Sequence, residues 1–162
     1  MKKLRLKLSP LRFPAIFIGL FFLNFNIAAS MVSFYIIETG LPDNGKIFQQ
    51  SVSWEDAFLE VFFDGGFIVS NAPILRLDDK PEGDILDYVN MHEAEKAGVD
   101  FLVIAQLDYV ELIPSEISFF IYKVTSTKKL MESKVQVRQI KVAREEYEYM
   151  KTVVRGLVGY IE

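Results

Sequence analysis

The sequence contains no cysteine among its 162 residues, and it has a single histidine, His92. Without cysteine the chain forms no disulfide, has no thiol chemistry and offers no N-terminal cysteine for lipid attachment. One histidine excludes a histidine-rich metal site, and a catalytic triad would require His92 to meet a nucleophile and an acid in space. We interpret His92 as an ordinary surface residue. No second long hydrophobic run follows the N-terminal one, which excludes a multi-pass membrane topology.

The first thirty residues have the order of a secretory signal peptide. A basic flank without acidic residues is followed by the hydrophobic run 15–23 and then by small residues directly before Met31. Cleavage at Met31 would leave residues 31–162 as a single domain, exported and periplasmic. The alternative is an uncleaved anchor in the inner membrane formed by residues 11–25, but a bilayer span needs about 20 mostly apolar residues.

Removal of this segment makes the remaining chain strongly acidic. Five of the 18 basic residues and none of the 22 acidic ones precede Met31, so 13 basic and 22 acidic residues remain, a net charge of about −9. An acidic domain is a poor ligand for nucleic acid or for anionic lipid, and neither is expected as a partner. Folding without disulfides must then depend on the core, for which about 130 residues are sufficient.

The stretch around which the fold is organised follows Gly98. Residues 101–105 are five consecutive apolar residues, Phe-Leu-Val-Ile-Ala, which are too few for a buried helix. Such a run is typical of a strand covered on both faces, in the middle of a mixed sheet with helices packed over it.

The residues before this strand predict two β-α units. A short strand at 34–37 precedes a helix that begins at Ser53 as N-cap and ends at Gly65-Gly66. The apolar residues of this helix recur at helical spacing and are expected in the core: Trp54, Ala57, Phe58, Val61 and Phe62.

After that helix we expect a strand at 67–70, a polar loop from Leu75 to Gly83 and a second helix at 84–97 that Gly98 ends.

The residues after the central strand predict a hairpin and a final helix. Two antiparallel strands, 117–124 and 130–140, are joined by the polar turn 125–129. The helix at 144–160 carries one apolar stripe: Tyr147, Met150, Val153, Val154, Leu157 and Ile161. The sequence therefore predicts an α/β (α+β) fold, with a mixed sheet of about five strands, three helices and the order β-α-β-α-β-β-β-α.

No residue pattern predicts a catalytic set or a cofactor. An acidic group before and within the second predicted helix is a candidate for Ca²⁺, which takes carboxylate oxygens from flexible loops: Asp78, Asp79, Glu82, Asp84 and Asp87. Its spacing does not match an EF-hand loop, so we interpret it as a solvated loop with a capping aspartate and assign no metal. Asp100 and Asp108, which bracket the central strand, have no partner motif either.

Three aromatic residues are candidates for contact with a partner. Phe63 adjoins the inward-facing Phe62 and therefore points about 100° away from the core. Strand alternation places Phe120 and Tyr122 on one face of the sheet and Phe119 on the other. If one face of the sheet is left bare by the helices, Phe120 and Tyr122 would be exposed there.

The segment Glu93–Ile104 resembles a known envelope domain. Its Ala94-x-x-x-Gly98-Val-Asp pattern before a hydrophobic strand, together with the element order and a turn like 125–129, is similar to the N-terminal domain of the translocation protein TolB. The same domain recurs in the curli secretion lipoprotein CsgG and the flagellar protein FlgT. The chain lacks the lipid-attachment cysteine and pore-forming hairpins of CsgG and is too short for the propeller of TolB.

The resemblance implies a non-enzymatic module that contacts other proteins of the envelope, and no functional residue carries over from it. The alternative is a periplasmic protein that binds a small ligand or Ca²⁺. A membrane contact is expected only if the signal segment is retained. The sequence does not identify the partner.

Overall fold

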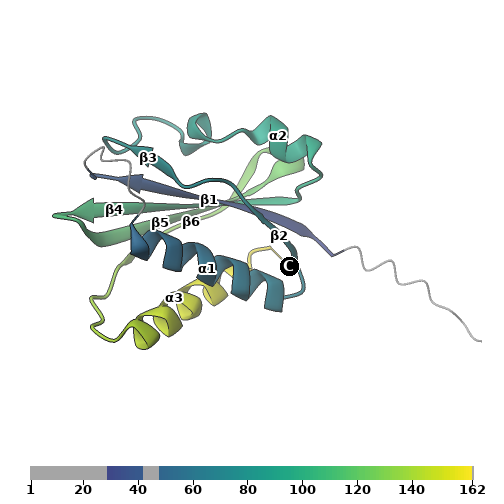
Figure 1. Cartoon of the computed structure of the whole chain (residues 1–162). Coiled ribbons are helices and arrows are strands. Elements are labelled where there is room, and N and C mark those ends of the chain that lie inside the picture. The colour runs from purple at the N-terminus through teal and green to yellow at the C-terminus, as the bar shows by residue number, and fades with distance from the viewer. Residues whose placement is uncertain (1–28, 42–47, 162) are drawn as a thin grey trace, which may run out of the picture.

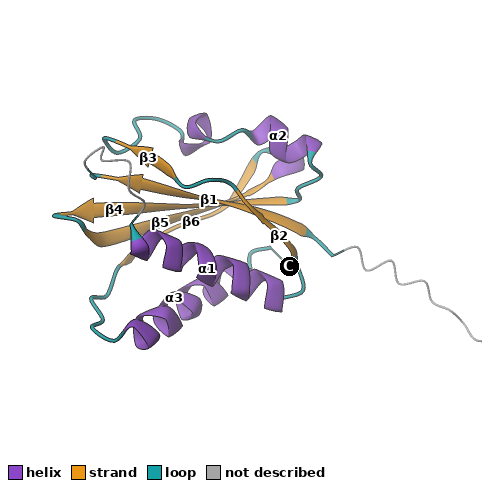
Figure 2. Ribbon diagram, in the orientation of Figure 1, coloured by secondary structure: helices purple, strands orange, loops and turns teal. Residues whose placement is uncertain are grey.

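The structure, a computed structural model, describes residues 29–41 and 48–161, so the predicted signal segment at 1–30 lies outside the described residues except for its last two positions. A sheet in the order β2-β1-β4-β5-β6, with β3 also paired to β1, separates two layers (Figures 1 and 2). Helices α1 and α3 cover one face, and the single-turn helix η1 and α2 cover part of the other. The strands are β1 (Met31–Thr39), β2 (Ile68–Asn71), β3 (Leu75–Leu77), β4 (Phe101–Val110), β5 (Ile113–Lys123) and β6 (Lys128–Gln136). The helices are α1 (Gln49–Asp64), η1 (Ile85–Tyr88), α2 (Met91–Lys96), η2 (Val124–Ser126) and α3 (Ala143–Val158).

The central strand is where the sequence predicts it. β4 runs parallel to β1 and antiparallel to β5, and residues 102–109 are buried. The continuous apolar run of β4 follows from this position, because helices pack over both faces of the strand. The predicted α/β class with a mixed sheet and three helices is confirmed.

The segment between β2 and β4 differs from the prediction in two ways. Part of the expected loop, Leu75–Leu77, forms a sixth strand parallel to β1. The expected helix at 84–97 is divided into η1 and α2, because Val89 between them is extended. The sequence explains the break, since Asp84 caps η1 through Leu86 N and Asn90 caps α2 through Glu93 N.

Helix α1 begins one turn earlier than predicted. It starts at Gln49, and Ser53 is not its N-cap: the Ser53 hydroxyl donates to the carbonyl oxygen of Gln49 at 3.0 Å, inside the helix. The inward stripe is confirmed, since the five predicted core residues are all buried. The helix ends at Gly65-Gly66 as expected, and Gly66 takes the positive φ of +84° that glycine tolerates.

The larger core lies between the sheet and the α1–α3 layer. The rings of Phe34 and Phe58 stack at 5.2 Å, and Phe119 of β5 meets Phe58 edge-on at 6.1 Å. The stripe of α3 packs on the same core, as the sequence predicts. On the other face a smaller core is covered by η1 and α2 and contains Ile37, Leu102, Ile104 and Tyr122.

Candidate functional site

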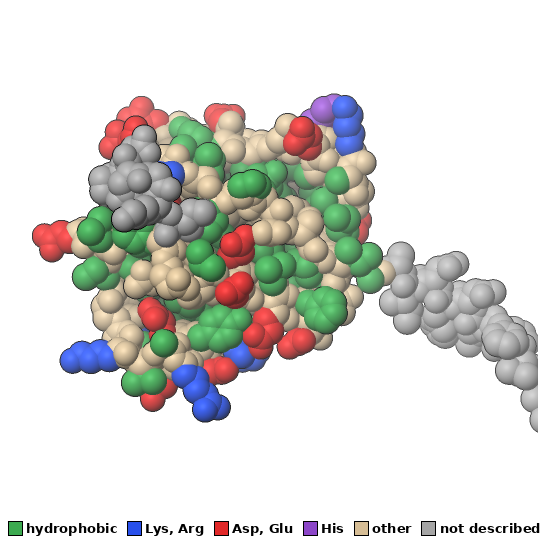
Figure 3. All heavy atoms as spheres, viewed as in Figure 1, with side chains coloured by type: hydrophobic (Ala, Val, Ile, Leu, Met, Phe, Trp, Pro, Cys, Tyr) green, Lys and Arg blue, Asp and Glu red, His purple; other side chains and the backbone are tan. Residues whose placement is uncertain are grey.

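An apolar groove lies between the last turns of α1 and strand β2. It has a volume of about 510 Å³ and is lined by Leu59, Glu60, Phe63, Phe67, Ile68 and Val69. Phe63 is 73% exposed and Ile68 is 54% exposed. Figure 3 shows hydrophobic side chains on the surface over this part of the molecule. Large apolar groups that stay in contact with water beside a groove are characteristic of a contact surface.

The one acidic residue that lines the groove is already paired. Glu60 accepts hydrogen bonds from Lys151 Nζ at 2.8 Å and from the Tyr147 hydroxyl at 2.9 Å. These two hydrogen bonds lower the pKa of Glu60 below its usual value, so its carboxylate stays ionised and neutralised by α3. An apolar partner therefore does not have to desolvate a free charge at this position.

β2 and β6, which lie at opposite ends of the strand order, differ in charge. β6 carries three lysines and a glutamate along its length, and charged side chains on an edge strand discourage pairing with another chain. β2 has the sequence Ile-Val-Ser-Asn and no charge. The amide of Ile68 donates to the carbonyl oxygen of Ser30, directly before β1, and the amide of Ala72 donates to that of Phe34 in β1. By strand alternation, the amide of Val69 therefore points away from β1. Among the described residues, β1 is the one strand that pairs with β2, and this edge has no strand on its other side.

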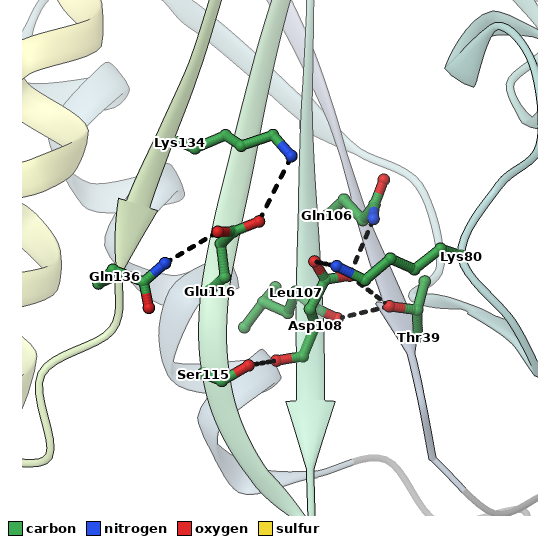
Figure 4. Close-up of polar contacts among 9 residues, drawn as sticks. All are labelled: Thr39, Lys80, Gln106, Leu107, Asp108, Ser115, Glu116, Lys134 and Gln136. Atoms are coloured by element: carbon green, nitrogen blue, oxygen red, sulfur yellow. Dashed lines mark hydrogen bonds and ion pairs between the residues drawn. The ribbon is translucent and has the colours of Figure 1, made fainter.

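A buried polar cluster lies at the carboxyl ends of β1 and β4, on the face that η1 and α2 cover only in part (Figure 4). Asp108 Oδ1 accepts hydrogen bonds from Thr39 Oγ1 at 2.5 Å and from Gln106 Nε2 at 2.9 Å. Lys80 Nζ, from the loop after β3, lies 2.6 Å from Asp108 Oδ2. Burial raises the pKa of Asp108, but the hydrogen bonds from Lys80, Thr39 and Gln106 outweigh it and the pKa lies below its usual value.

The same cluster continues across β5 to β6. Ser115 Oγ donates to the carbonyl oxygen of Asp108 at 2.9 Å. Glu116, opposite Asp108 on β5, accepts from Gln136 at 2.8 Å and pairs with Lys134 at 3.5 Å. These contacts join β4, β5 and β6 to the loop that carries Lys80. A carboxylate with three donors and a lowered pKa is a poor proton acceptor near neutral pH, so the cluster has the character of a structural network.

Replacement of Asp108 by asparagine should make the stability of the protein fall less steeply as the pH is lowered. A carboxyl group whose pKa is lowered by folding adds stability above its unfolded pKa, here about 3.8, and this contribution is lost as the pH falls through the native pKa. The measurement is the midpoint of thermal unfolding from neutral pH down to strongly acid pH. Asp79→Asn, at an exposed position of the same loop, is the control. An unchanged acid slope in Asp108→Asn would contradict this assignment.

The acidic residues predicted as calcium candidates are all exposed and do not converge. Asp84 caps η1 and also accepts from the Tyr122 hydroxyl at 3.4 Å. Within residues 29–41 and 48–161 no set of three or more His, Asp or Glu side chains could hold a metal ion. The other candidates are Asp78, Asp79, Glu82 and Asp87, and His92 also lies on the surface.

The three predicted aromatic contact residues have different surroundings. Phe63 is exposed. Phe120 is partly buried in the wall of a polar cavity of about 350 Å³, and Lys129 Nζ lies 5.5 Å from its ring centre. Tyr122 is buried, and the prediction that it is an exposed contact is wrong. The part of the sheet face on which Tyr122 lies is covered by η1 and α2. Alternation within one strand shows which face a residue is on, but it does not show whether that face is covered.

The chain matches a protein family over residues 43–153, and the description of this family is "Uncharacterised protein". The chain belongs to this family. A search among the curated proteins found no matching sequence.

Solved structures give distant likenesses. TolB from Acinetobacter baumannii is 11% identical with a TM-score of 0.45, over 81% of this chain and 29% of TolB, so the chain spans less than a third of that protein. The lipoprotein GNA1162 from Neisseria meningitidis is 10% identical with a TM-score of 0.49, over 80% of this chain and 99% of that one. The LpoB C-terminal domain from Salmonella enterica is 12% identical with a TM-score of 0.42, over 68% and 84%.

These likenesses include TolB, whose N-terminal domain the sequence resembles, whereas neither CsgG nor FlgT is among the three. In the part of the chain that the structure describes, no helix is long and apolar enough to cross a membrane.

Proposed function

We propose that the chain is an exported, non-enzymatic module of the cell envelope that works by binding another polypeptide in the groove between α1 and β2. The observation that carries this proposal is the exposure of Phe63, at 73%, and of Ile68, at 54%, on opposite sides of that groove. The signal-peptide pattern of residues 1–30 supports export to the periplasm.

The groove has the properties of a protein-binding site. Aromatic residues in a pocket that excludes water provide most of the binding energy of typical interfaces. Phe63 and Phe67 supply such rings, and the uncharged edge of β2 supplies backbone groups for a partner in extended conformation. The partner expected from this surface is a polypeptide with apolar side chains rather than a charged polymer.

The test is photo-crosslinking in the cell with a C-terminally tagged full chain. A photoreactive residue at Phe63 should form a cross-linked adduct, whereas the same residue at Val142, an exposed apolar position before α3, should not. Fractionation of the same cells should recover the tagged protein with the envelope or periplasm, with its N-terminus at about Met31. Equal cross-linking at both positions, or recovery in the cytoplasm, would contradict the proposal.

A further inference from the structure

The hairpin between β4 and β5 has an exposed apolar tip. Val110 pairs with Ile113, so the turn consists of only two residues, Glu111 and Leu112. The aliphatic side chains of the tip are largely in solvent: Val110 is 60% exposed, Leu112 50% and Ile113 47%. Packing among the described residues of the domain leaves these three aliphatic side chains largely uncovered.

The backbone of this tip is strained. Glu111 has a φ of +51° and Leu112 a φ of +68°. Two-residue hairpins with positive φ at both positions prefer Asn-Gly or Asp-Gly, because other side chains collide with the backbone there. A leucine kept in such a conformation, with its side chain in water, points to a contact outside the domain.

The tip and the groove lie at opposite ends of the molecule (Figure 1). β1 and β4 are parallel, the groove lies at Ile68 beside the start of β1, and the tip follows the end of β4. Because β4 has ten residues, the two surfaces are separated by about 30 Å along the strand direction. One chain cannot place its own tip in its own groove.

We infer that the tip of one copy of this chain docks in the groove of a second copy, in a head-to-tail arrangement. The groove, of about 510 Å³, accommodates more than one aliphatic side chain, and its lining is apolar apart from the paired Glu60. On the other side of the last turn of α1, a second cavity is lined by Arg155 and by Asp64, and Arg155 is the cation there that would meet Glu111. One contact of this kind removes both exposed apolar surfaces from water.

The inference rests on the proposed function, because it names the polypeptide that occupies the groove. Because tip and groove are different surfaces, each bound copy leaves one tip and one groove free. Association is therefore expected to continue beyond a dimer, until a ring closes or a filament forms.

The test is the mass in solution of the tagged protein purified as the cell processes it, measured by sedimentation over a wide concentration range. The wild-type mass should exceed that of a dimer at high concentration. Leu112→Asp at the tip and Phe63→Asp in the groove should each give monomers. Their equimolar mixture should form a species of two copies, because the intact tip of Phe63→Asp binds the intact groove of Leu112→Asp. No larger species should form, because the tip and the groove that remain free in this pair are the two mutated ones. Val142→Asp is the control and should assemble like the wild type.

A second variant tests the strain of the tip separately. Glu111→Asn combined with Leu112→Gly should raise the melting temperature, because it relieves the positive φ angles, and should abolish assembly, because it removes Leu112. A melting temperature that does not rise would contradict the strain argument.

Assembly that persists in the tip variants, a mixture that stays monomeric, or a wild type that is monomeric at all concentrations would each overturn the inference. If Phe63 nevertheless cross-links to another protein in the cell, the proposed function stands and only the second copy is excluded as occupant.

Discussion

Replacement of Phe58 by alanine is expected to lower the free energy of unfolding by about 3–5 kcal/mol. Phe58 is fully buried, stacks on Phe34 at 5.2 Å and on Phe62 at 5.8 Å, and also meets Phe119. Its loss leaves a cavity at the centre of the larger core, where three elements meet and none can collapse freely. The fluorescence of Trp54, the single tryptophan, reports the unfolding transition in denaturant.

The matched control is Phe63→Ala on the same helix. Since Phe63 is exposed, this replacement should change stability by no more than about 0.5 kcal/mol. The two variants, Phe58→Ala and Phe63→Ala, compare phenylalanines five residues apart, one in the core and one on the proposed contact surface. A large loss of stability in Phe63→Ala would show that the groove is part of the core, and it would remove the observation on which the proposed function rests.

Replacement of Arg76 by alanine is expected to lower the free energy of unfolding by about 3–5 kcal/mol, because it leaves a buried carboxylate without its cationic partner. Glu38 of β1 is fully buried, and its Oε2 accepts from Arg76 Nε at 3.0 Å and from Arg76 Nη2 at 2.5 Å. The guanidinium also lies 5.6 Å from the ring centre of Phe48. Chemical denaturation of the purified variant measures the effect.

An exposed ion pair provides the control for this second prediction. Lys129 pairs with Glu132 at 2.9 Å, but both side chains are in solvent, and Lys129→Ala should cost less than about 1 kcal/mol. A similar loss in both variants would mean that burial does not distinguish the two pairs. Replacement of Glu38 and Arg76 together by apolar residues should restore much of the lost stability, since the desolvation of both charges is then avoided.

The sequence predicted those parts of the fold whose signal is local. The apolar run of β4, the stripes of α1 and α3 and the glycines that end α1 and α2 lie within one element each. β3 was missed because three residues carry too little pattern to separate a strand from a loop. The cap at Asn90 was a local signal for the broken helix, and the prediction, which used only a capping aspartate, did not use it.

The candidate site depended on contacts between distant segments and was largely unpredictable. Glu60 and Lys151 are 91 residues apart, and neither stands out in the sequence. The burial of Tyr122 is decided by the layer that covers it, which alternation within β5 does not encode. The tip of the β4–β5 hairpin was missed because Glu-Leu is not a typical turn pair. Phe63 was found because its neighbour Phe62 belongs to a clear helical stripe.

The position of β1 in the sheet has a consequence for how the chain becomes a folded protein. β1 is the first strand to be synthesised, but its neighbour β4 begins 70 residues later, with Phe101 opposite Val32. Contacts of such sequence separation form slowly, because a long loop must close before they contribute. The pairing of β1 with β4 cannot be completed until about two thirds of the chain, up to Val110, has left the ribosome. If the chain is exported as proposed, this delay keeps the emerging polypeptide in the unfolded form that a translocation channel accepts.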